Sequence, residues 1–224
     1  MRKLWTLLCL IALPAAAHAP LLDTSAKTAT APLVLDQPEH SKVIFSELTG
    51  APQHYQITSD RAFDFYVGVT APKLEGCGLP ETFSFDVMDA AGKLIDGREG
   101  DSLTWVPWFE EYGKNWYWVG PEIGKAFAHD RQYPAGTYTI KVFNKDNRGQ
   151  YALAVGDQEK FGLGTMLTIG GTMKAVKEQF WDEGRCLRSD IANRINVGMV
   201  FVNHSTWTAP DLPFGGIKNS GHGR

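Results

Sequence analysis

Cysteine is scarce in this chain, with three among 224 residues, and none has the spacing to histidine or cysteine that a zinc site needs. The chain also has no large excess of charge of one sign, because it has 22 lysines and arginines and 25 aspartates and glutamates. The absence of a basic stripe argues against nucleic acid as a partner. The motifs of serine hydrolases, zinc proteases and phosphate-binding loops are also absent. We therefore expect no catalytic residue, no cofactor and no metal.

The N-terminus has the three-part pattern of an export signal. Two basic residues precede an apolar run over 4–14, and an Ala-His-Ala sequence that ends at Ala19 has the small residues of a cleavage site. The apolar run is shorter than the roughly 20 residues that a membrane-spanning helix needs. We predict a signal peptide over 1–19 and a periplasmic or extracellular protein that can associate with the envelope. After cleavage Cys77 and Cys186 remain, and the sequence leaves open whether they pair.

Alternation of apolar and polar residues dominates the middle of the chain. A period of two residues is typical of half-buried strands, and it recurs in four stretches, 62–69, 83–87, 137–142 and 151–155. Shorter candidate strands are 43–46, 55–58, 103–106, 116–119 and 123–127. Turns rich in glycine, proline and asparagine join them without helical patterns. These features predict an all-β fold, an antiparallel jelly-roll-like β-sandwich over 41–159, after a flexible N-terminal segment over 20–40.

Two phrases within this region resemble known exported proteins. The sequence P-A-G-T-Y-T-I-K-V, from Pro134 to Val142, resembles the last hairpin of the pre-peptidase C-terminal (PPC-like) modules of secreted proteins. The stretch F-E-E-Y-G-K-N-W-Y-W-V-G-P-E is similar to uncharacterised exported proteins of bacteria and archaea. The resemblance covers about 20–160. It implies a jelly-roll sandwich and no known activity.

The pattern changes over 160–182, where apolar residues recur at mixed helical spacing. We predict a short amphipathic helix from Thr172 to Trp181, with Lys174 and Lys177 on its polar face. Such a helix can pack on the sandwich or contact a membrane surface through 161–181. The periodicity favours packing and leaves the peripheral membrane contact as the alternative.

The last part of the chain, 183–224, carries two specific motifs, G-M-V-F-V-N and L-P-F-G-G-I-K-N-S-G-H-G-R. They resemble the C-terminal part of aldehyde dehydrogenases, especially the succinate-semialdehyde type. That family needs a thiolate nucleophile, a glutamate base and a nucleotide-binding domain, which the resemblance places upstream of this segment. Cys186 does not match the catalytic motif of the family. We expect an α/β-derived fragment that is inactive on its own. The sequence leaves open whether a gene fusion, a recombination event or an assembly artefact joined it to the chain.

Aromatic residues are concentrated over 105–118, together with two glutamates. Indole faces stack on sugar rings and nearby carboxylates bind hydroxyls, so this stretch could bind a glycan or a protein ligand. Packing in the core is the alternative, and aromatics in β-proteins are mostly packing residues. The candidate ligand-binding residues are Trp105, Trp108, Glu110, Glu111, Tyr112, Trp116 and Trp118.

A second group of polar residues lies on a predicted hairpin: Asp86, Asp89, Asp96, Glu99 and Asp101. Carboxylates can hold calcium, but their spacing differs from that of an EF-hand, and a solvated acidic loop is the favoured interpretation.

These features together predict an exported, non-enzymatic β-sandwich module that binds a ligand or partner at the cell envelope. Two alternatives remain from the sequence. One is an NAD(P)-dependent oxidoreductase fragment that the tail identifies, and the other is a membrane-associated structural module.

Overall fold

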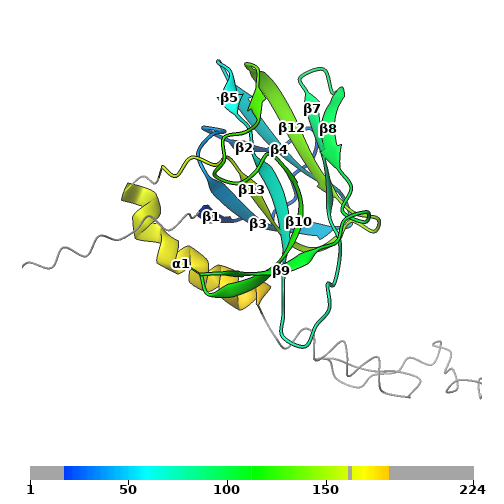
Figure 1. The fold of residues 1–224 in the computed structure, drawn as a ribbon, viewed down its shortest axis with the longest axis vertical. Coiled ribbons are helices and arrows are strands. Elements are labelled where there is room, and N and C mark those ends of the chain that lie inside the picture. Colours follow the sequence, from blue (N-terminus) through cyan, green and yellow to red (C-terminus); the bar gives the residue numbers. More distant parts are fainter. Residues whose placement is uncertain (1–17, 112, 161–162, 182–224) are drawn as a thin grey trace, which may run out of the picture.

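The computed structural model describes residues 18–111, 113–160 and 163–181. The predicted tail fragment 183–224, Tyr112 and most of the predicted signal peptide lie outside these residues. Two sheets pack face to face (Figure 1). The larger has six strands in the order β1 (Ala19–Leu22), β3 (Lys42–Thr49), β13 (Arg148–Val155), β6 (Val67–Pro72), β10 (Asn115–Ile123) and β9 (Val106–Glu110). The smaller has five, in the order β2 (Leu33–Leu35), β4 (Gln53–Ser59), β12 (Gly136–Phe143), β7 (Ser84–Asp89) and β8 (Leu94–Arg98).

Pairing within the sheets is antiparallel except at two edges, where β1 pairs with β3 and β2 pairs with β4 in parallel. A separate two-stranded ladder joins β5 (Phe63–Asp64) to β11 (Gln132–Tyr133). The helix α1 (Leu163–Phe180) lies against the larger sheet. The predicted all-β sandwich is therefore confirmed, and in the described part of the chain one helix follows its last strand.

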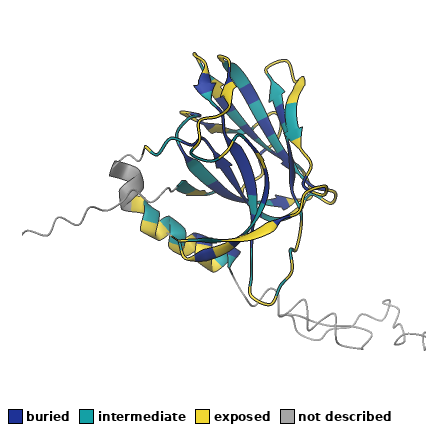
Figure 2. Ribbon diagram, viewed as in Figure 1, coloured by how far each residue is buried: buried dark blue, intermediate teal, exposed yellow. Residues whose placement is uncertain are grey.

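The core between the sheets consists of the alternating apolar residues. Figure 2 shows the buried positions alternating with half-buried ones along the strands. The inward residues of the four predicted stretches are buried in a single cluster: Phe63, Phe65, Val67, Val69, Phe83, Phe85, Val87, Tyr138, Ile140, Val142, Tyr151, Leu153 and Val155. Burying such side chains stabilises a fold by about 1.5–3 kcal/mol each, so this alternation determines which face of each sheet points inward.

Some predicted strand boundaries differ from the structure. The stretch 62–69 forms parts of two strands, β5 and β6, because between them the Phe65 amide donates to the Arg131 carbonyl at 2.7 Å. The strand predicted over 103–106 begins only at Val106. Of the stretch 123–127, only Ile123 belongs to a strand, as the last residue of β10. The rest is a loop, since Gly124 and Phe127 have positive φ values of 74° and 60°. These φ values are incompatible with a strand.

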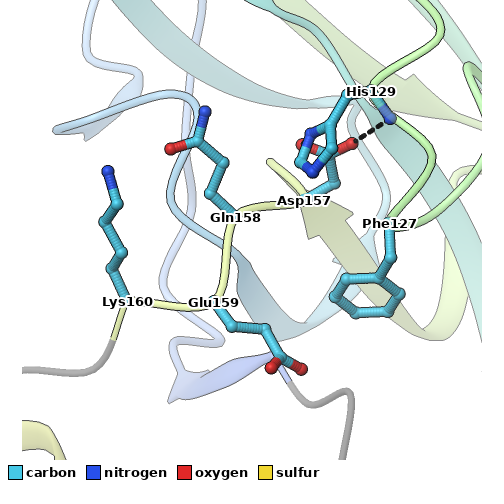
Figure 3. A pocket seen from close by; sticks show the side chains of 6 residues that line it. All are labelled: Phe127, His129, Asp157, Gln158, Glu159 and Lys160. Carbon is cyan, nitrogen blue, oxygen red and sulfur yellow. Dashed lines mark hydrogen bonds and ion pairs between the residues drawn. The ribbon is translucent and has the colours of Figure 1, made fainter.

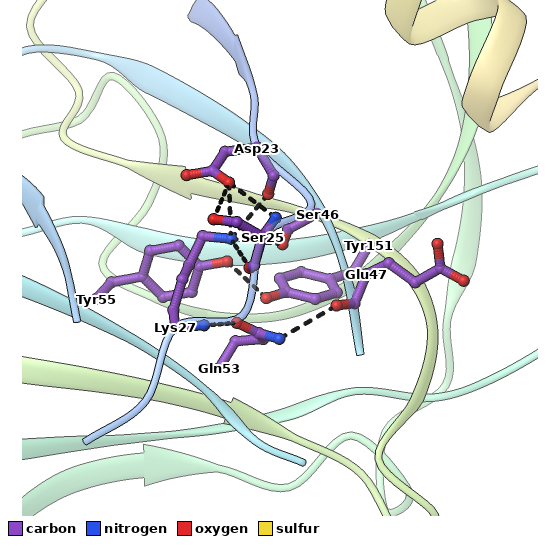
Figure 4. A network of polar contacts seen from close by, with 8 residues as sticks. All are labelled: Asp23, Ser25, Lys27, Ser46, Glu47, Gln53, Tyr55 and Tyr151. Carbon is purple, nitrogen blue, oxygen red and sulfur yellow. Dashed lines mark hydrogen bonds and ion pairs between the residues drawn. The ribbon is translucent and has the colours of Figure 1, made fainter. Parts of the chain in front are cut away.

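The segment 20–40, expected to be flexible, contains most of β1 and all of β2 in the structure. A buried polar network holds it against the sandwich (Figure 4). The ammonium group of Lys27, a residue only 3% exposed, donates to the carbonyl oxygens of Asp23 at 2.8 Å and Ser25 at 2.7 Å. It also donates to Ser46 Oγ at 3.2 Å, while the Lys27 amide donates to Gln53 Oε1 at 2.7 Å. A lysine in a polar stretch is usually a surface residue, so the sequence pattern did not indicate that Lys27 is buried and anchors this segment.

The helix α1 begins at Leu163, earlier than the predicted start at Thr172, and ends at Phe180. Val176 and Phe180 are buried against Phe45 and Tyr117 on the outer face of the larger sheet. Trp181 Nε1 donates to the Trp116 carbonyl at 3.0 Å, which fixes the end of the helix beside β10. Of the two predicted roles, α1 takes the packing role. Within the described part of the chain, no helix is long and apolar enough to span a bilayer.

Cys77 is disulfide-bonded, and its partner lies outside the described residues. The cysteine follows β6 in a turn in which its amide donates to the Leu74 carbonyl at 3.3 Å. In the structure Cys77 is therefore part of a disulfide and is not a free thiol.

Candidate ligand-binding site

The candidate aromatic residues lie mainly on the hairpin of β9 and β10, whose two faces differ. The register pairs Trp116 with Phe109 and Tyr117 with Trp108. Since side chains alternate along a strand, Trp116 and Trp118 share one face, and Tyr117 and Trp108 share the other. The structure thus places Trp116 and Trp118 on a different face of the hairpin from Trp108, so the described members of the predicted set do not meet at one site.

Trp105 belongs to neither surface, because it is a core residue. It is 6% exposed, its Nε1 donates to the Gly100 carbonyl at 3.0 Å, and its ring packs edge-on to Phe83. The ring also lies so close to Gly120 that a Cβ there would be 2.3 Å from it. Trp105 is unavailable to a ligand, so the packing interpretation holds for this residue.

The first surface combines Trp116, Trp118 and a lysine. Lys73 Nζ lies 5.3 Å from the ring centroid of Trp116 and 5.6 Å from that of Trp118. Trp116 is 46% exposed, while Trp118 packs against the core. Trp118 Nε1 is buried with no hydrogen-bond partner among the described residues. This surface offers one open indole with a cation above it.

The two predicted glutamates differ in their surroundings. Glu111 is exposed and pairs with Lys114 at 2.8 Å. Glu110 is half-buried and its Oε2 accepts a hydrogen bond from the Gly113 amide. Only Glu110 is placed beside Trp108 and Tyr117, on the second surface.

That second surface is hollowed into a cavity of about 690 Å³ on the outer face of the larger sheet, beside α1. Ligand sites in proteins are commonly clefts of roughly 300–1,000 Å³, lined by apolar groups with a few polar ones. The apolar residues that line this cavity include Pro20, Val43, Phe45, Val69, Trp108, Tyr117, Val119, Pro121, Ala126, Phe127, Ala154 and Met173. The polar ones include His18, Tyr66, Thr70, Glu110, Glu122 and Lys125.

One end of the cavity is polar because β10 is irregular. The register of β10 with β6 shifts between Val119 and Glu122, and such bulges redirect side chains. Tyr66 Oη donates to Glu122 Oε2 at 3.4 Å. Burial and the nearby Glu122 carboxylate raise the pKa of Tyr66, so its hydroxyl stays protonated at neutral pH. Gly68 leaves room for this ring, since a Cβ there would lie 2.6 Å from Tyr66 Oη.

The loop after β10 closes the same end. Phe127 is held at a φ of 60°, which is costly for an aromatic residue, and such strain is common at binding sites. The loop is fixed by the Ala128 amide, which donates to the Lys125 carbonyl at 3.0 Å. His18 lies against this loop, with its ring 5.2 Å from Phe127 and 6.2 Å from Tyr66, stacked on the latter at 9°. Burial lowers the pKa of His18 to about 4.

Most of these residues were not candidates from the sequence. Trp108 and Glu110 were, but Tyr66, Glu122, Lys125 and Phe127 come from separate turns and the bulge. A positive φ at a non-glycine residue has no sequence signal that reports it. Glu122-Ile123-Gly124 after a run of aromatics was the nearest indication of an irregular strand end.

A smaller hollow of about 390 Å³ lies next to Phe127, around His129 and Asp157 (Figure 3). Asp157 is buried and accepts two hydrogen bonds from His129, from the amide and from Nδ1, both at 3.0 Å. Asp64 Oδ2 lies 3.5 Å from the same ring nitrogen. A histidine between carboxylates can act as a general base, and here the two carboxylates hold the His129 ring in place. Through these contacts Asp157 fixes the position of the loop that contains His129.

The predicted carboxylate group is dispersed. Asp86 pairs with Lys141 at 3.1 Å, and Asp96 pairs with Arg98 at 2.6 Å and Arg131 at 3.0 Å. Asp89 accepts two turn amides, while Glu99 and Asp101 accept hydroxyls of Ser84 and Thr82. Among the described residues no three acidic, histidine or cysteine side chains form a metal-binding group. The acidic side chains thus have partners within the protein.

The tail has relatives among known enzymes. The pattern of the aldehyde dehydrogenase family matches residues 182–224. A succinate-semialdehyde dehydrogenase (NADP+) of Deinococcus radiodurans is 59% identical over 96 residues, 43% of this chain and 17% of that protein. An aldehyde dehydrogenase of Paenarthrobacter nicotinovorans is 25% identical over 173 residues, 74% of this chain and 35% of that protein. The chain thus spans between 17% and 35% of the length of these two relatives. The resemblance of the tail is confirmed.

The sandwich is similar to a solved pre-peptidase C-terminal domain, the class of module that the sequence from Pro134 to Val142 resembles. This is the pre-peptidase C-terminal domain of a collagenase from Bacillus anthracis, with a TM-score of 0.32 and 11% identity. The match covers 60% of this chain and 98% of that domain. Likeness at this level carries no argument about function, so the fold class rests on the strand order and burial described above.

Proposed function

We propose that this chain is an exported, non-enzymatic β-sandwich that binds an apolar ligand in the cavity between the larger sheet and α1. The observation that carries the proposal is the cavity itself, about 690 Å³ with an apolar floor and a polar end. Two residues already favoured by the sequence, Trp108 and Glu110, line it. Its volume and its mostly apolar lining with a few polar groups are those of common ligand sites.

Filling the cavity is expected to abolish ligand binding. Ala154 is 9% exposed and lines the cavity floor on β13, so Ala154→Phe places a ring in the ligand space. We expect the neutral fluorescent probe N-phenyl-1-naphthylamine to bind the wild-type protein and to bind this variant at least tenfold more weakly. A fluorescence titration measures both. Thr70→Phe, on the neighbouring strand, fills the same space and should act alike.

Trp116→Ala is the matched control, because Trp116 lies on the opposite face of the same hairpin. It should leave the probe affinity unchanged. Circular dichroism must show that both filled variants remain folded. Absence of probe binding to the wild-type protein, or equal binding by folded filled variants, would contradict the proposal.

Export is supported by the signal-like N-terminus and by the disulfide at Cys77, since disulfides persist in oxidising compartments. We expect the exported protein to begin at Pro20. The Cys77 peptide should then be joined to the Cys186 peptide, because Cys9 is removed with the leader. Mass spectrometry without reduction tests both statements. A mature protein that retains its first residues, or free thiols in the exported form, would contradict them.

The proposal assigns no turnover to the tail. The known enzymes that it resembles are several times longer than their match to this chain. Aldehyde dehydrogenases combine a thiolate, a base and a nucleotide fold, and a C-terminal piece of this length is too short to supply a nucleotide-binding domain. Oxidation of succinate semialdehyde with NADP+ by the purified chain would contradict this part of the proposal.

A second candidate function is recognition of a glycan or protein on the surface around Trp116. The observation that favours it is the exposed indole with Lys73 above it. Loss of partner binding in Trp116→Ala, with unchanged probe binding in the cavity, would identify this surface as the functional one.

A further inference from the structure

The two ends of the cavity differ in what they can bind. The long floor under α1 offers aliphatic and aromatic contacts from Val43, Phe45, Val119 and Met173. At the other end the His18 ring occupies the space beside Tyr66 and Phe127, stacked on Tyr66 and tilted against Phe127. An elongated apolar body with a flat head therefore matches the shape of the cavity.

The charges that line the cavity as a whole act against an anionic head. Glu110 and Glu122 outnumber Lys125 among the charged residues that line the cavity, so an anionic head meets a net negative charge. A cationic head would lose its hydration at the polar end. The His18 ring occupies this end beside Tyr66 and Phe127, and burial lowers the pKa of the ring to about 4, so it is neutral there at neutral pH.

Hydrogen bonding further restricts the head. Glu122 accepts from Tyr66 Oη at 3.4 Å, a long contact that leaves the carboxylate able to accept a second donor. Ser41 Oγ forms a hydrogen bond with His18 Nδ1. These groups suit an uncharged ring that carries a hydroxyl or an N–H.

We infer that the cavity takes a neutral aromatic ring with a hydrogen-bond donor and an alkyl tail, the ring taking the place of His18, stacked on Tyr66 and in contact with Phe127. The inference rests on the proposed function of the cavity and names its ligand class. Cleavage after Ala19 would remove His18 from this position. Export processing would then open the ring site, and the unprocessed chain would bind this ligand weakly.

Competition against N-phenyl-1-naphthylamine tests the inference on the processed protein that begins at Pro20. The competitors are 4-nonylphenol, dodecanoate and dodecyltrimethylammonium, all below their micelle concentrations. We expect 4-nonylphenol to compete at least tenfold more strongly than either ion. Phe127→Ala should reduce its affinity about tenfold, and the chain that retains His18 should show a similar reduction. Trp116→Ala should match the wild-type protein.

Equal competition by the three compounds would overturn the ligand class while leaving the cavity as a binding site. Unchanged affinity for 4-nonylphenol in folded Phe127→Ala would overturn the ring position. Failure of the probe itself to bind would instead remove the proposed function, so the two failures are distinguishable.

Discussion

Replacing Trp105 with alanine is expected to lower the free energy of unfolding by about 3–5 kcal/mol, the usual cost of deleting a large buried aromatic side chain. The ring is 6% exposed and packs over Gly120 and against Phe83. Its removal also leaves the Gly100 carbonyl without the indole donor. Urea denaturation followed by circular dichroism measures the change without depending on tryptophan fluorescence.

Trp116→Ala is the matched substitution for this prediction. Trp116 is 46% exposed, so we expect its loss to change stability by less than about 1 kcal/mol. A similar stability for the two variants would mean that Trp105 is not a core residue, and the division of the aromatic set between core and surface would be wrong.

Lys27→Met should destabilise the protein by about 2–4 kcal/mol, since it leaves buried polar groups without their charged partner. The ammonium group bonds two carbonyls and Ser46, and lies 3.3 Å from Asp23 Oδ1. Methionine keeps the length of the side chain, so packing is largely retained. Urea denaturation gives the magnitude, and hydrogen exchange should show faster exchange over 19–31.

Lys141→Met is the control, because Lys141 pairs with Asp86 at 3.1 Å in a site where both side chains stay partly exposed. Partly exposed ion pairs contribute about 0–1 kcal/mol, and a change of that size is expected. If Lys27→Met lowered the free energy of unfolding by no more than Lys141→Met, the network in Figure 4 would not be the anchor of the N-terminal segment.

The sequence predicted the sandwich well because each inward face follows a two-residue period. Phe83, Phe85 and Val87 alternate in the sequence and all three are fully buried. Strand ends were less accurate, since they depend on hydrogen bonds between distant residues, such as that from the Phe65 amide to Arg131. The N-terminal anchor was missed for a related reason. It depends on a lysine, and the burial of a charge is determined by partners brought together only in the fold.

The candidate site was predicted in part. Local composition identified Trp108 and Glu110, which lie on a single hairpin. It could not separate them from Trp105 and Trp116, because the inward or outward direction of each ring depends on the register of β9 with β10. The sequence did not predict the polar end of the cavity. Its residues come from the segment before β6, the bulge in β10 and a loop with positive φ angles, which only the fold brings together.

Hydrogen exchange of the processed protein, with and without saturating N-phenyl-1-naphthylamine, tests the cavity most directly. We predict slower exchange in β6, β10 and α1, which border the cavity, and no change in β12 and β7 of the opposite sheet. Protection confined to the five-stranded sheet, or no protection anywhere, would contradict the assignment of this chain as a binding module with its ligand beneath α1.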